Sequence, residues 1–144
     1  MSFVKNDSAG YLINHMARLF AQELTARIKP LGLTTGTFPA LLELWDQDGL
    51  TQKQLVTRLG IEQATMANTL NRMERDGLVT RRKDPKDGSA QLVWLTERAR
   101  SLQGPAIAAA EGVNGDLLSG LTGDEQAQLL ALMGKVIAGQ AEGH

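Results

Sequence analysis

The sequence predicts a mainly helical domain that carries one small β-hairpin. Apolar residues recur at helical spacing over most of the chain, and glycine or proline interrupts them at intervals. Between residues 51 and 96, two helical segments are followed by two β-compatible runs with a turn-rich spacer between them. The chain has 144 residues, of which 42% are hydrophobic, so one domain with its own core is expected.

The composition narrows the classes of function. No apolar run approaches the length of a bilayer span, and the N-terminus lacks a basic segment followed by an apolar one. Neither a membrane partner nor a secretory signal is therefore predicted. The chain has no cysteine, which excludes disulfides, thiolate zinc sites and thiol redox chemistry. A cytoplasmic protein is the expectation.

The first predicted helix covers residues 8–29. Ser8 is a suitable N-cap, and Pro30 with Gly32 ends the helix. Such a helix is expected to bury one side against its own chain and the other against a partner, because its apolar positions are wider than one narrow stripe. These positions are Tyr11, Leu12, Met16, Leu19, Phe20, Leu24 and Ile28.

Two short helices are predicted next. The second helix starts near Thr37, because Pro39 is tolerated only in the first turn, and it ends at residues 48–49. Thr51 and Gln54 have the spacing of a capping box for the third helix, which Gly60 ends. The predicted core faces are Phe38, Leu41, Leu42, Leu44 and Trp45 in the second helix, and Leu55, Val56 and Leu59 in the third.

A fourth helix is predicted from Ile61 to about Arg75, with Gly77 as its stop signal. One face is apolar, at Met66, Leu70 and Met73, and the opposite face carries small and polar side chains. Residues 78–82 and 91–95 then favour the two strands of a hairpin. The eight-residue spacer 83–90 between them forms an exposed basic tip.

Two more helices complete the prediction. Thr96 is a suitable cap for a helix from Glu97 to about Leu118, which is expected to be interrupted at Gly104-Pro105, where the proline should cause a kink. Thr122 and Glu125 form a second capping box, which starts a last amphipathic helix. Its apolar residues are Leu129, Leu130, Leu132, Met133, Val136 and Ile137.

Positive charge is concentrated in the middle of an otherwise acidic chain. Residues 51–86 contain eight basic and four acidic side chains, a local charge of +4, whereas the whole chain carries −1. The remainder therefore carries −5. This asymmetry favours a basic nucleic-acid-binding face on an acidic scaffold, and a solvated surface that is merely basic is the alternative.

Two helices joined by a tight turn and followed by a β-hairpin form a winged helix-turn-helix. In this arrangement the polar face of the second helix enters the major groove. The start of the preceding helix meets phosphate, and the hairpin, called the wing, lies along the neighbouring backbone or minor groove. The predicted DNA-binding residues are Thr51, Gln54, Gln63, Ala64, Thr65, Asn68, Thr69, Arg72, Arg81, Arg82, Lys83 and Lys86.

Individual side chains can contact different chemical groups of DNA. Asn68 suits adenine, Arg72 suits guanine or a phosphate, and Ala64 or Thr65 suits a thymine methyl group. The alternative is that Asn68, Thr69 and Arg72 only solvate a surface helix. The combination of a polar helix face with a basic hairpin favours DNA binding.

These segments resemble the MarR (multiple antibiotic resistance regulator) transcription factors. The resemblance rests on LTQKQL at 50–55, on the pattern of 65–73, on DGLVTR at 76–81, on DPKD at 84–87 and on Leu95-Thr96. The order of the surrounding helices extends it to nearly the whole chain. It implies a single MarR-like domain over 1–144, with a winged lobe at 34–96 and a dimerisation region formed by 8–30 and 97–140.

The resemblance also implies a function. Such proteins are homodimers whose N- and C-terminal helices intertwine and whose two winged lobes bind near-palindromic operator DNA, usually as repressors. Many release the DNA when they bind a small aromatic or phenolic molecule. The expected partners are therefore double-stranded DNA, a second copy of the chain and a small aromatic effector.

The sequence departs from the family pattern in the wing. Family members typically carry Asp-x-Arg there, with the arginine in the minor groove, but the corresponding residues are Asp87, Gly88 and Ser89. A serine cannot supply the positive charge that a narrow minor groove attracts. We expect Lys83 or Lys86 to substitute, and the wing, Ser89 included, to touch phosphates and contribute little to sequence choice.

The family resemblance places an effector pocket between the first, second and fifth helices. The candidate ligand-binding residues are Tyr11, His15, Arg18, Phe38 and Trp45, an aromatic and basic set that suits an aromatic acid. For Phe38 and Trp45, packing in the core is the alternative interpretation.

The sequence gives little support for metal binding or catalysis. His15 and His144 are the only histidines, and they have no metal-binding spacing with acidic residues. No catalytic triad order, glycine-rich phosphate loop or carboxylate pair is visible. The sequence therefore predicts no metal, no cofactor and no enzymatic activity.

The leading hypothesis is a ligand-responsive, dimeric, DNA-binding transcriptional regulator. A second hypothesis is a protein-interaction module, in which a winged-helix dimer has lost operator binding; the missing wing arginine and the moderate charge of +4 favour it. A third is a constitutive DNA binder without an effector. A gel-shift with the intergenic DNA beside the gene separates the first two, and its response to ligand separates the third.

Overall fold

The computed structural model of the chain describes residues 2–142, and His144 lies outside them. Six α-helices, two 3-10 turns and three strands make up this part of the chain. In chain order they are η1 (Lys5–Asp7), α1 (Ala9–Ile28), η2 (Lys29–Leu31), α2 (Phe38–Asp46), β1 (Leu50–Thr51), α3 (Gln52–Leu59), α4 (Gln63–Arg75), β2 (Val79–Lys83), β3 (Gln91–Leu95), α5 (Glu97–Leu117) and α6 (Gly123–Glu142). The predicted class, mainly α with a small β wing, is confirmed.

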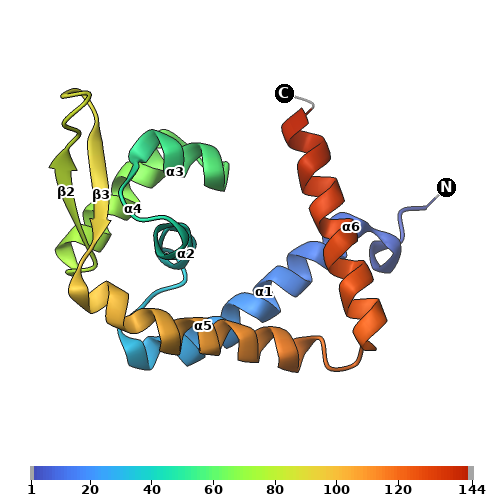
Figure 1. Ribbon diagram of the computed structural model, residues 1–144. Coiled ribbons are helices and arrows are strands. Elements are labelled where there is room, and N and C mark those ends of the chain that lie inside the picture. Colours follow the sequence, from blue (N-terminus) through green and yellow to red (C-terminus); the bar gives the residue numbers. More distant parts are fainter. Residues whose placement is uncertain (1, 143–144) are drawn as a thin grey trace.

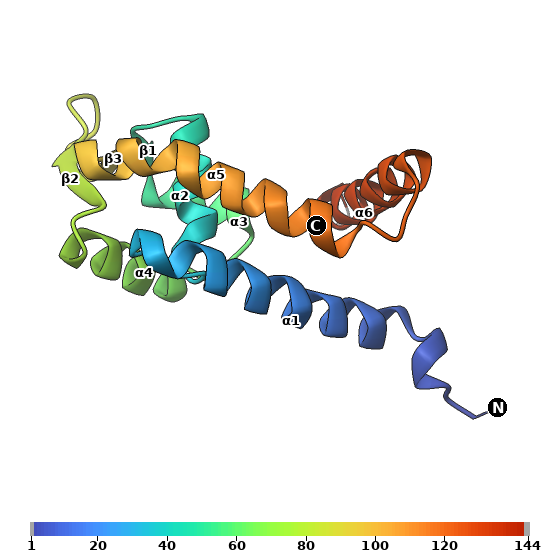
Figure 2. The same cartoon turned by 90° about the horizontal axis from the view of Figure 1, so that it is seen from below.

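The elements form a lobe and an extended helical region (Figure 1). The lobe contains α2, α3, α4 and the sheet. Helices α1 and α5 pack against each other and run away from the lobe, as both views show, and α6 turns back from the far end of α5 (Figure 2). Within residues 2–142, every helix is too short or too polar to cross a membrane.

Local signals define most helix boundaries. Ser8 caps α1 by accepting a hydrogen bond from the Tyr11 backbone N–H, as predicted. Both capping boxes are present: Thr51 and Gln54 exchange bonds of 2.8 and 3.1 Å, and Thr122 and Glu125 exchange bonds of 2.9 and 3.1 Å. These reciprocal bonds satisfy backbone donors that the first helical turn would leave unpaired.

The structure differs from the prediction at two helices. Helix α4 begins at Gln63 and not at Ile61, because Gly60 has a left-handed φ of 64° and Glu62 is still extended. Helix α5 continues through Pro105 without interruption. The proline therefore removes one helical hydrogen bond but does not end the helix.

The sheet has three antiparallel strands in the order β1-β3-β2, one more than the predicted hairpin. The extra strand, β1, pairs Leu50 with Val93, and the Asp48 carboxylate accepts a hydrogen bond from the Leu95 N–H at 2.9 Å. Strand β2 starts one residue later than predicted. The Leu78 N–H instead donates to the Met73 carbonyl at 2.9 Å, which closes the C-terminal turn of α4.

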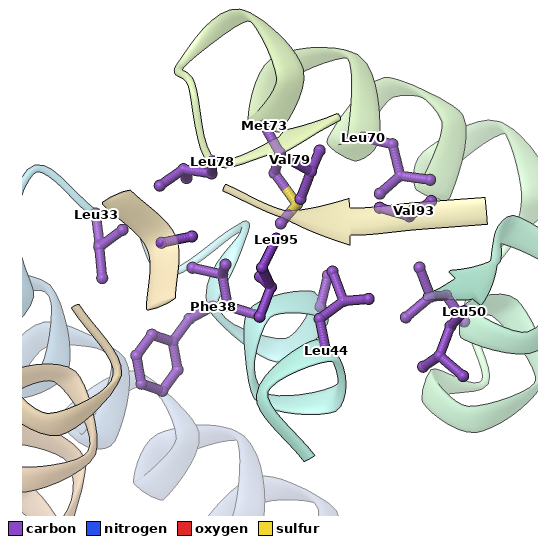
Figure 3. Packing of buried hydrophobic residues seen from close by; sticks show 14 of the residues in the cluster. Leu33, Phe38, Leu44, Leu50, Leu70, Met73, Leu78, Val79, Val93 and Leu95 are labelled. Carbon is purple, nitrogen blue, oxygen red and sulfur yellow. The ribbon is translucent and has the colours of Figure 1, made fainter. Parts of the chain in front are cut away.

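The core lies between α2, α4 and the sheet (Figure 3). Met66, Leu70 and Met73 of α4 are fully buried and pack in the same cluster as Val79, Val93 and Leu95. Because one face of α4 is fixed in this core, the opposite face must point outwards. The predicted apolar face of α4 is therefore confirmed.

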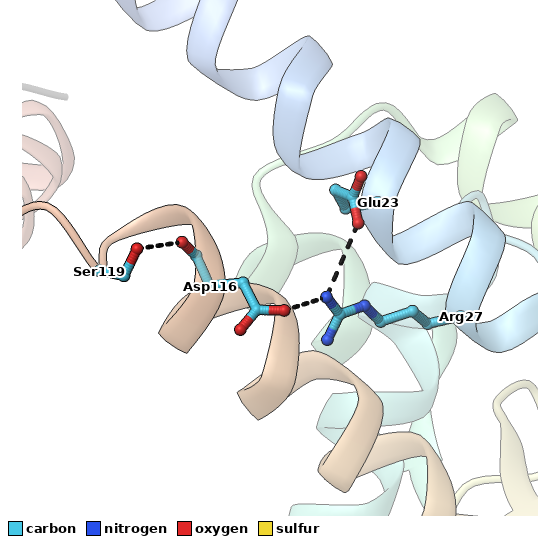
Figure 4. A network of polar contacts seen from close by, with 4 residues as sticks. All are labelled: Glu23, Arg27, Asp116 and Ser119. Atoms are coloured by element: carbon cyan, nitrogen blue, oxygen red, sulfur yellow. Dashed lines mark hydrogen bonds and ion pairs between the residues drawn. The ribbon is translucent and has the colours of Figure 1, made fainter.

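Polar contacts join the lobe to the helical region. The Trp45 indole N–H donates to the Ala99 carbonyl at 3.0 Å, and the Arg100 guanidinium donates to the Leu95 carbonyl at 2.7 Å. Farther along, Arg27 of α1 pairs with Asp116 of α5 and, at 3.7 Å, with Glu23 (Figure 4). The hydrogen bond with Asp116 is the main cause that raises the pKa of Arg27. These contacts link the orientation of the lobe to that of α1 and α5.

Candidate nucleic-acid interface

Helix α4 has a polar face that is open to solvent. Opposite its buried residues, Ala64, Thr65, Asn68 and Arg72 are exposed, and Gln63 in the first turn is exposed as well. Thr69 is half-buried, and its hydroxyl donates to the Thr65 carbonyl at 2.9 Å. All six were predicted from the sequence to bind DNA, and the helical spacing of five of them, Ala64, Thr65, Asn68, Thr69 and Arg72, puts these on one side of α4, whereas Gln63 lies at the start of the helix beside the groove described below. We call that side the polar face of α4.

Arg72 lies at the edge of this face, next to the segment that precedes α2. Its Nη1 atom is 3.6 Å from the position that a Cβ would take on Gly36. The guanidinium is exposed and forms no ion pair within residues 2–142. It is therefore available to a phosphate or a base edge.

The start of α3 faces a polar groove. Thr51 and Gln54 were both predicted to meet phosphate. In the structure, the side-chain oxygen of each accepts a backbone hydrogen bond of the capping box. The Gln54 amide nitrogen has no such bond within the described chain. The groove, of about 650 Å³, is lined by Thr51, Gln52, Lys53, Gln63, Gln91 and residues 83, 84 and 87–90 of the wing.

The two wing arginines point in different directions. Arg81 is only 18% exposed, and its Nη2 atom donates to Asn71 Oδ1 at 2.5 Å while its Nε atom lies 3.9 Å from Glu74. Arg82 instead lies over the ring of Trp94, 5.9 Å from its centre. Successive side chains of a strand alternate between its faces, so one arginine contacts α4 and its neighbour contacts the other side of the sheet.

The wing tip is ordered by two aspartates. Asp84 accepts a hydrogen bond from the Lys86 backbone N–H at 2.9 Å. Asp87 accepts bonds from the Ser89 hydroxyl at 2.6 Å and from the Ser89 N–H at 3.0 Å. These bonds, the hydroxyl bond first, lower the pKa of Asp87. Lys83 and Lys86 are exposed, so the tip presents two lysines beside two carboxylates.

The structure therefore sorts the predicted DNA-binding residues into groups. Thr51, Gln63, Lys83 and Ser89 line the groove, whereas the polar face of α4, Gln54 and Lys86 do not. Arg81 and Arg82 are engaged within the chain. Sequence reasoning missed Gln52 and Lys53, which line the groove, and Asn71, which holds Arg81. The polar residues that directly follow Thr51 were the available signal for the first two.

The five candidate ligand-binding residues form two separate pairs and one exposed arginine. Tyr11 and His15 pair edge to face on the exposed side of α1, with ring centres 6.4 Å apart, and Arg18 is exposed on the same helix. Phe38 is buried and packs edge to face on Trp45, at 6.0 Å. This places Phe38 and Trp45 in contact with the core, the alternative that the sequence left open.

Two apolar cavities lie beside α1 and α5, and neither is lined by any of these five residues. The smaller, of about 260 Å³, lies between Phe20, Ala21 and Leu24 of α1, Thr35, and residues 110, 113 and 114 of α5. The larger, of about 410 Å³, lies between α1, the end of α5 and α6. The smaller cavity is thus close to the predicted location, between the first and fifth helices and the segment before the second.

A helix-turn-helix with a buried face and an outward polar face, followed by an antiparallel wing, defines a winged helix-turn-helix DNA-binding protein. Comparisons with known proteins specify the family. A model of the MarR family matches residues 31–88. The transcriptional regulator HosA of Escherichia coli is 32% identical over 125 residues, which cover 85% of this chain and 93% of HosA. The chain belongs to the MarR family of transcriptional regulators and binds DNA in that capacity.

Solved structures agree with this assignment. A MarR transcriptional regulator from Methanosarcina mazei has a TM-score of 0.87 and 24% identity, over 94% of this chain and 97% of the other. A MarR family transcriptional regulator from Listeria monocytogenes, crystallised with a 26mer DNA, has a TM-score of 0.83 and 25% identity, over 99% and 91% of the two chains. The first likeness concerns the fold alone.

Proposed function

We propose that the chain acts as a homodimeric repressor on a near-palindromic operator, with the polar face of α4 in the major groove. One observation carries this proposal: the face of α4 opposite the core is exposed and holds Asn68 and Arg72, which suit base edges. The groove beside it ends at the wing, where Lys83 can neutralise phosphate charge. Repression is supported by the family to which the chain belongs.

A second surface supports the dimer. Apolar side chains of α1 and α6 are uncovered in the protomer, among them Ile13 at 63%, Val136 at 64% and Ile137 at 71% exposure. Patches of this kind on two long helices suit a self-complementary interface around a two-fold axis. Such an axis would also relate two copies of α4, so that each reads one half-site.

The experiment combines oligomeric state with DNA binding. The full chain is examined by light scattering, and its binding sites are selected from random DNA and compared with the intergenic DNA beside its gene. We expect a particle of twice the chain mass and a selected site with two inverted half-sites about one helical turn, ~10 base pairs, apart. Affinity should fall steeply with salt. A reporter behind the selected site should lose expression when the protein is present.

Other results would contradict the proposal. A monomer, or a protein that enriches no sequence, would exclude an operator-binding dimer. Binding to no DNA by a folded dimer would favour the protein-interaction hypothesis, which is motivated by the engagement of Arg81 and Arg82 within the chain. A rise in reporter expression would replace repression by activation.

We also propose that a small aromatic molecule releases the DNA. The cavity of about 260 Å³ between α1 and α5 supports this, because its lining is largely apolar and suits one aromatic ring. None of Tyr11, His15, Arg18, Phe38 and Trp45 lines this cavity, so the proposed ligand contacts are residues that do, such as Phe20, Leu24 and Val113. Benzoate-type ligands are titrated against tryptophan fluorescence and in the gel-shift. Saturable quenching together with loss of the shift is expected, and no change across a broad panel would favour a constitutive binder.

A further inference from the structure

The first residue of α3 is hydrogen-bonded to the first residue of α4. The Gln52 Nε2 atom lies 3.1 Å from Gln63 Oε1 and 3.5 Å from the Gln63 backbone carbonyl oxygen. Gln52 is half-buried, Gln63 is exposed, and both line the groove between the start of α4 and the wing. The contact therefore joins the two helices at the edge of the polar face of α4.

The two contacts determine which way each amide group points. A backbone carbonyl oxygen can only accept a hydrogen bond, so Gln52 must turn its NH₂ group, and not its oxygen, towards Gln63. The same NH₂ group then requires an acceptor in the Gln63 side chain, which is Oε1. The opposite orientation of both amides would place the Gln52 oxygen against the carbonyl oxygen of residue 63.

This orientation leaves the Gln63 amide as a hydrogen-bond donor. Its oxygen accepts from Gln52, and within residues 2–142 its Nε2 atom donates to no protein group. The free NH₂ group belongs to an exposed side chain at the N-terminal end of α4, the end that reads base edges in helix-turn-helix proteins. A donor in this place favours a base edge that presents acceptors.

We propose that Gln52 is a positioning residue that fixes Gln63 as a donor and so sets its preference for guanine. Guanine presents two acceptors, N7 and O6, in the major groove. Adenine presents an acceptor and a donor, and a glutamine reads it best with both its NH₂ group and its oxygen. Gln52 occupies one of the two lone pairs of that oxygen and holds it towards α3, so the adenine pairing has to share the acceptor, whereas the NH₂ group is fully free for guanine. The inference rests on the proposed role of α4 as the base-reading helix.

The test measures base preference with full-length variants. The site selected by the wild-type chain is varied one base pair at a time, and affinities are compared for wild type, Gln52→Met, Gln63→Met and the double variant. Methionine keeps the length of the side chain and removes the amide. Lys53→Met is the matched control, because Lys53 lines the same groove on the same helix and forms no hydrogen bond or ion pair with Gln63.

The expected result is specific to one position. Wild type should prefer guanine over adenine at one base pair of each half-site, by roughly tenfold. Gln52→Met and Gln63→Met should each lose most of this preference, and the double variant should lose no more than Gln63→Met alone. Lys53→Met should weaken all sequences by a common factor. Urea unfolding checks that every variant is folded.

Several results would overturn the inference. A Gln52→Met variant that keeps the guanine preference, or that weakens every sequence equally, would leave Gln52 with only a structural role. A wild-type preference for adenine at the position sensitive to Gln63→Met, or no sensitive position at all, would exclude the donor role of Gln63. A wild-type chain that selects no sequence would reject the proposed function itself, and this inference with it.

Discussion

The Nη2 atom of Arg81 lies 2.5 Å from Asn71 Oδ1, so β2, the first strand of the wing, is joined directly to α4. The same side chain has its Nε atom 3.9 Å from Glu74, one turn farther along α4. That Nε atom is buried and has no hydrogen-bond partner within residues 2–142. Arg81 therefore fixes the angle between helix and wing, and its charge is directed into the protein.

Removing this contact should destabilise the lobe. Arg81→Met keeps the apolar stem and loses the guanidinium, and Asn71→Ala loses the acceptor. We expect each to lower the free energy of unfolding by about 1–2 kcal/mol, because a hydrogen bond from a charged donor is lost. The measurement is urea unfolding of the two variants and of the double variant.

The double variant provides the control. If the two residues act through one contact, its loss of stability should be smaller than the sum of the single losses, by about 1 kcal/mol. Strictly additive losses would mean that Arg81 and Asn71 stabilise the lobe independently. Arg75→Met is a suitable comparison, since Arg75 is exposed and its ion pair with Asp76 is a surface contact.

The apolar face of α6 predicts the effect of a charge on assembly. Ile137 is 71% exposed in the protomer, so Ile137→Glu should leave the protomer folded and place a carboxylate in the proposed dimer interface. We expect dimer dissociation to become at least tenfold easier in sedimentation at a series of concentrations. Leu42 was predicted to lie in the core but is 38% exposed on α2, so Leu42→Glu is the control and should leave assembly unchanged. Equal effects of the two substitutions would place the interface elsewhere.

Arg72 and Lys83 should contribute differently to DNA binding. Arg72 lies on the polar face of α4, so Arg72→Ala should cost about 1–3 kcal/mol on the selected site and relax the preference for one base. Lys83 lines the groove from the wing side, so Lys83→Ala should weaken all sequences alike and reduce the salt slope by about 1. Binding isotherms on selected and random DNA at several salt concentrations separate the two. An Arg72→Ala variant with unchanged preference would assign Arg72 to phosphate.

The pKa of Asp87 provides a pH-dependent readout of the wing. Its folded-state pKa is depressed by the two bonds from Ser89. The stabilisation that this gives to the tip is therefore present above the ordinary aspartate pKa, about 3.9, and is lost as pH falls through the lower folded value. Ser89→Ala removes the hydroxyl bond, the larger cause, so the pKa of Asp87 should rise towards its ordinary value. Carboxyl NMR titration measures it, and an unchanged pKa would mean that the hydroxyl bond is absent in solution.

How far the sequence predicted this structure depends on the range of each signal. The capping boxes, the glycine stops and the periodic face of α4 are local patterns, and they located the helices within about two residues. Strand β1 was not predicted, because its two residues, Leu50 and Thr51, form a strand only by pairing with β3. A two-residue segment has no periodicity of its own.

The same difference between local patterns and long-range packing applies to the candidate site. The outward residues of α4 could be identified from Met66, Leu70 and Met73 on the opposite side. The sequence could also show that Arg81 and Arg82 lie on opposite faces of a strand. It could not show that Arg81 is the one that contacts α4, because this depends on how β2 packs against the helix. The pair Gln52–Gln63 depends in the same way on the packing of α3 against α4.

The wing serine predicts a gain of affinity on substitution. Ser89 occupies the position where the family pattern has an arginine, and it lies at an exposed tip beside Gly88. Ser89→Arg adds one positive charge where a narrow minor groove would attract it. We expect tighter binding to sites with A·T-rich flanks, by about 1 kcal/mol, and a salt slope that is steeper by about 1.

A comparison with Ser89→Lys and Ser89→Ala separates charge from shape. Ser89→Ala removes the bond to Asp87 without adding charge, so any change it causes reflects the order of the tip. If arginine and lysine act equally, and equally on all flanks, the added charge only contacts phosphate. A gain for arginine alone, confined to A·T-rich flanks, would show that the wing reaches the minor groove. No gain for either would mean that the tip, as Asp84 and Asp87 hold it, does not approach the DNA.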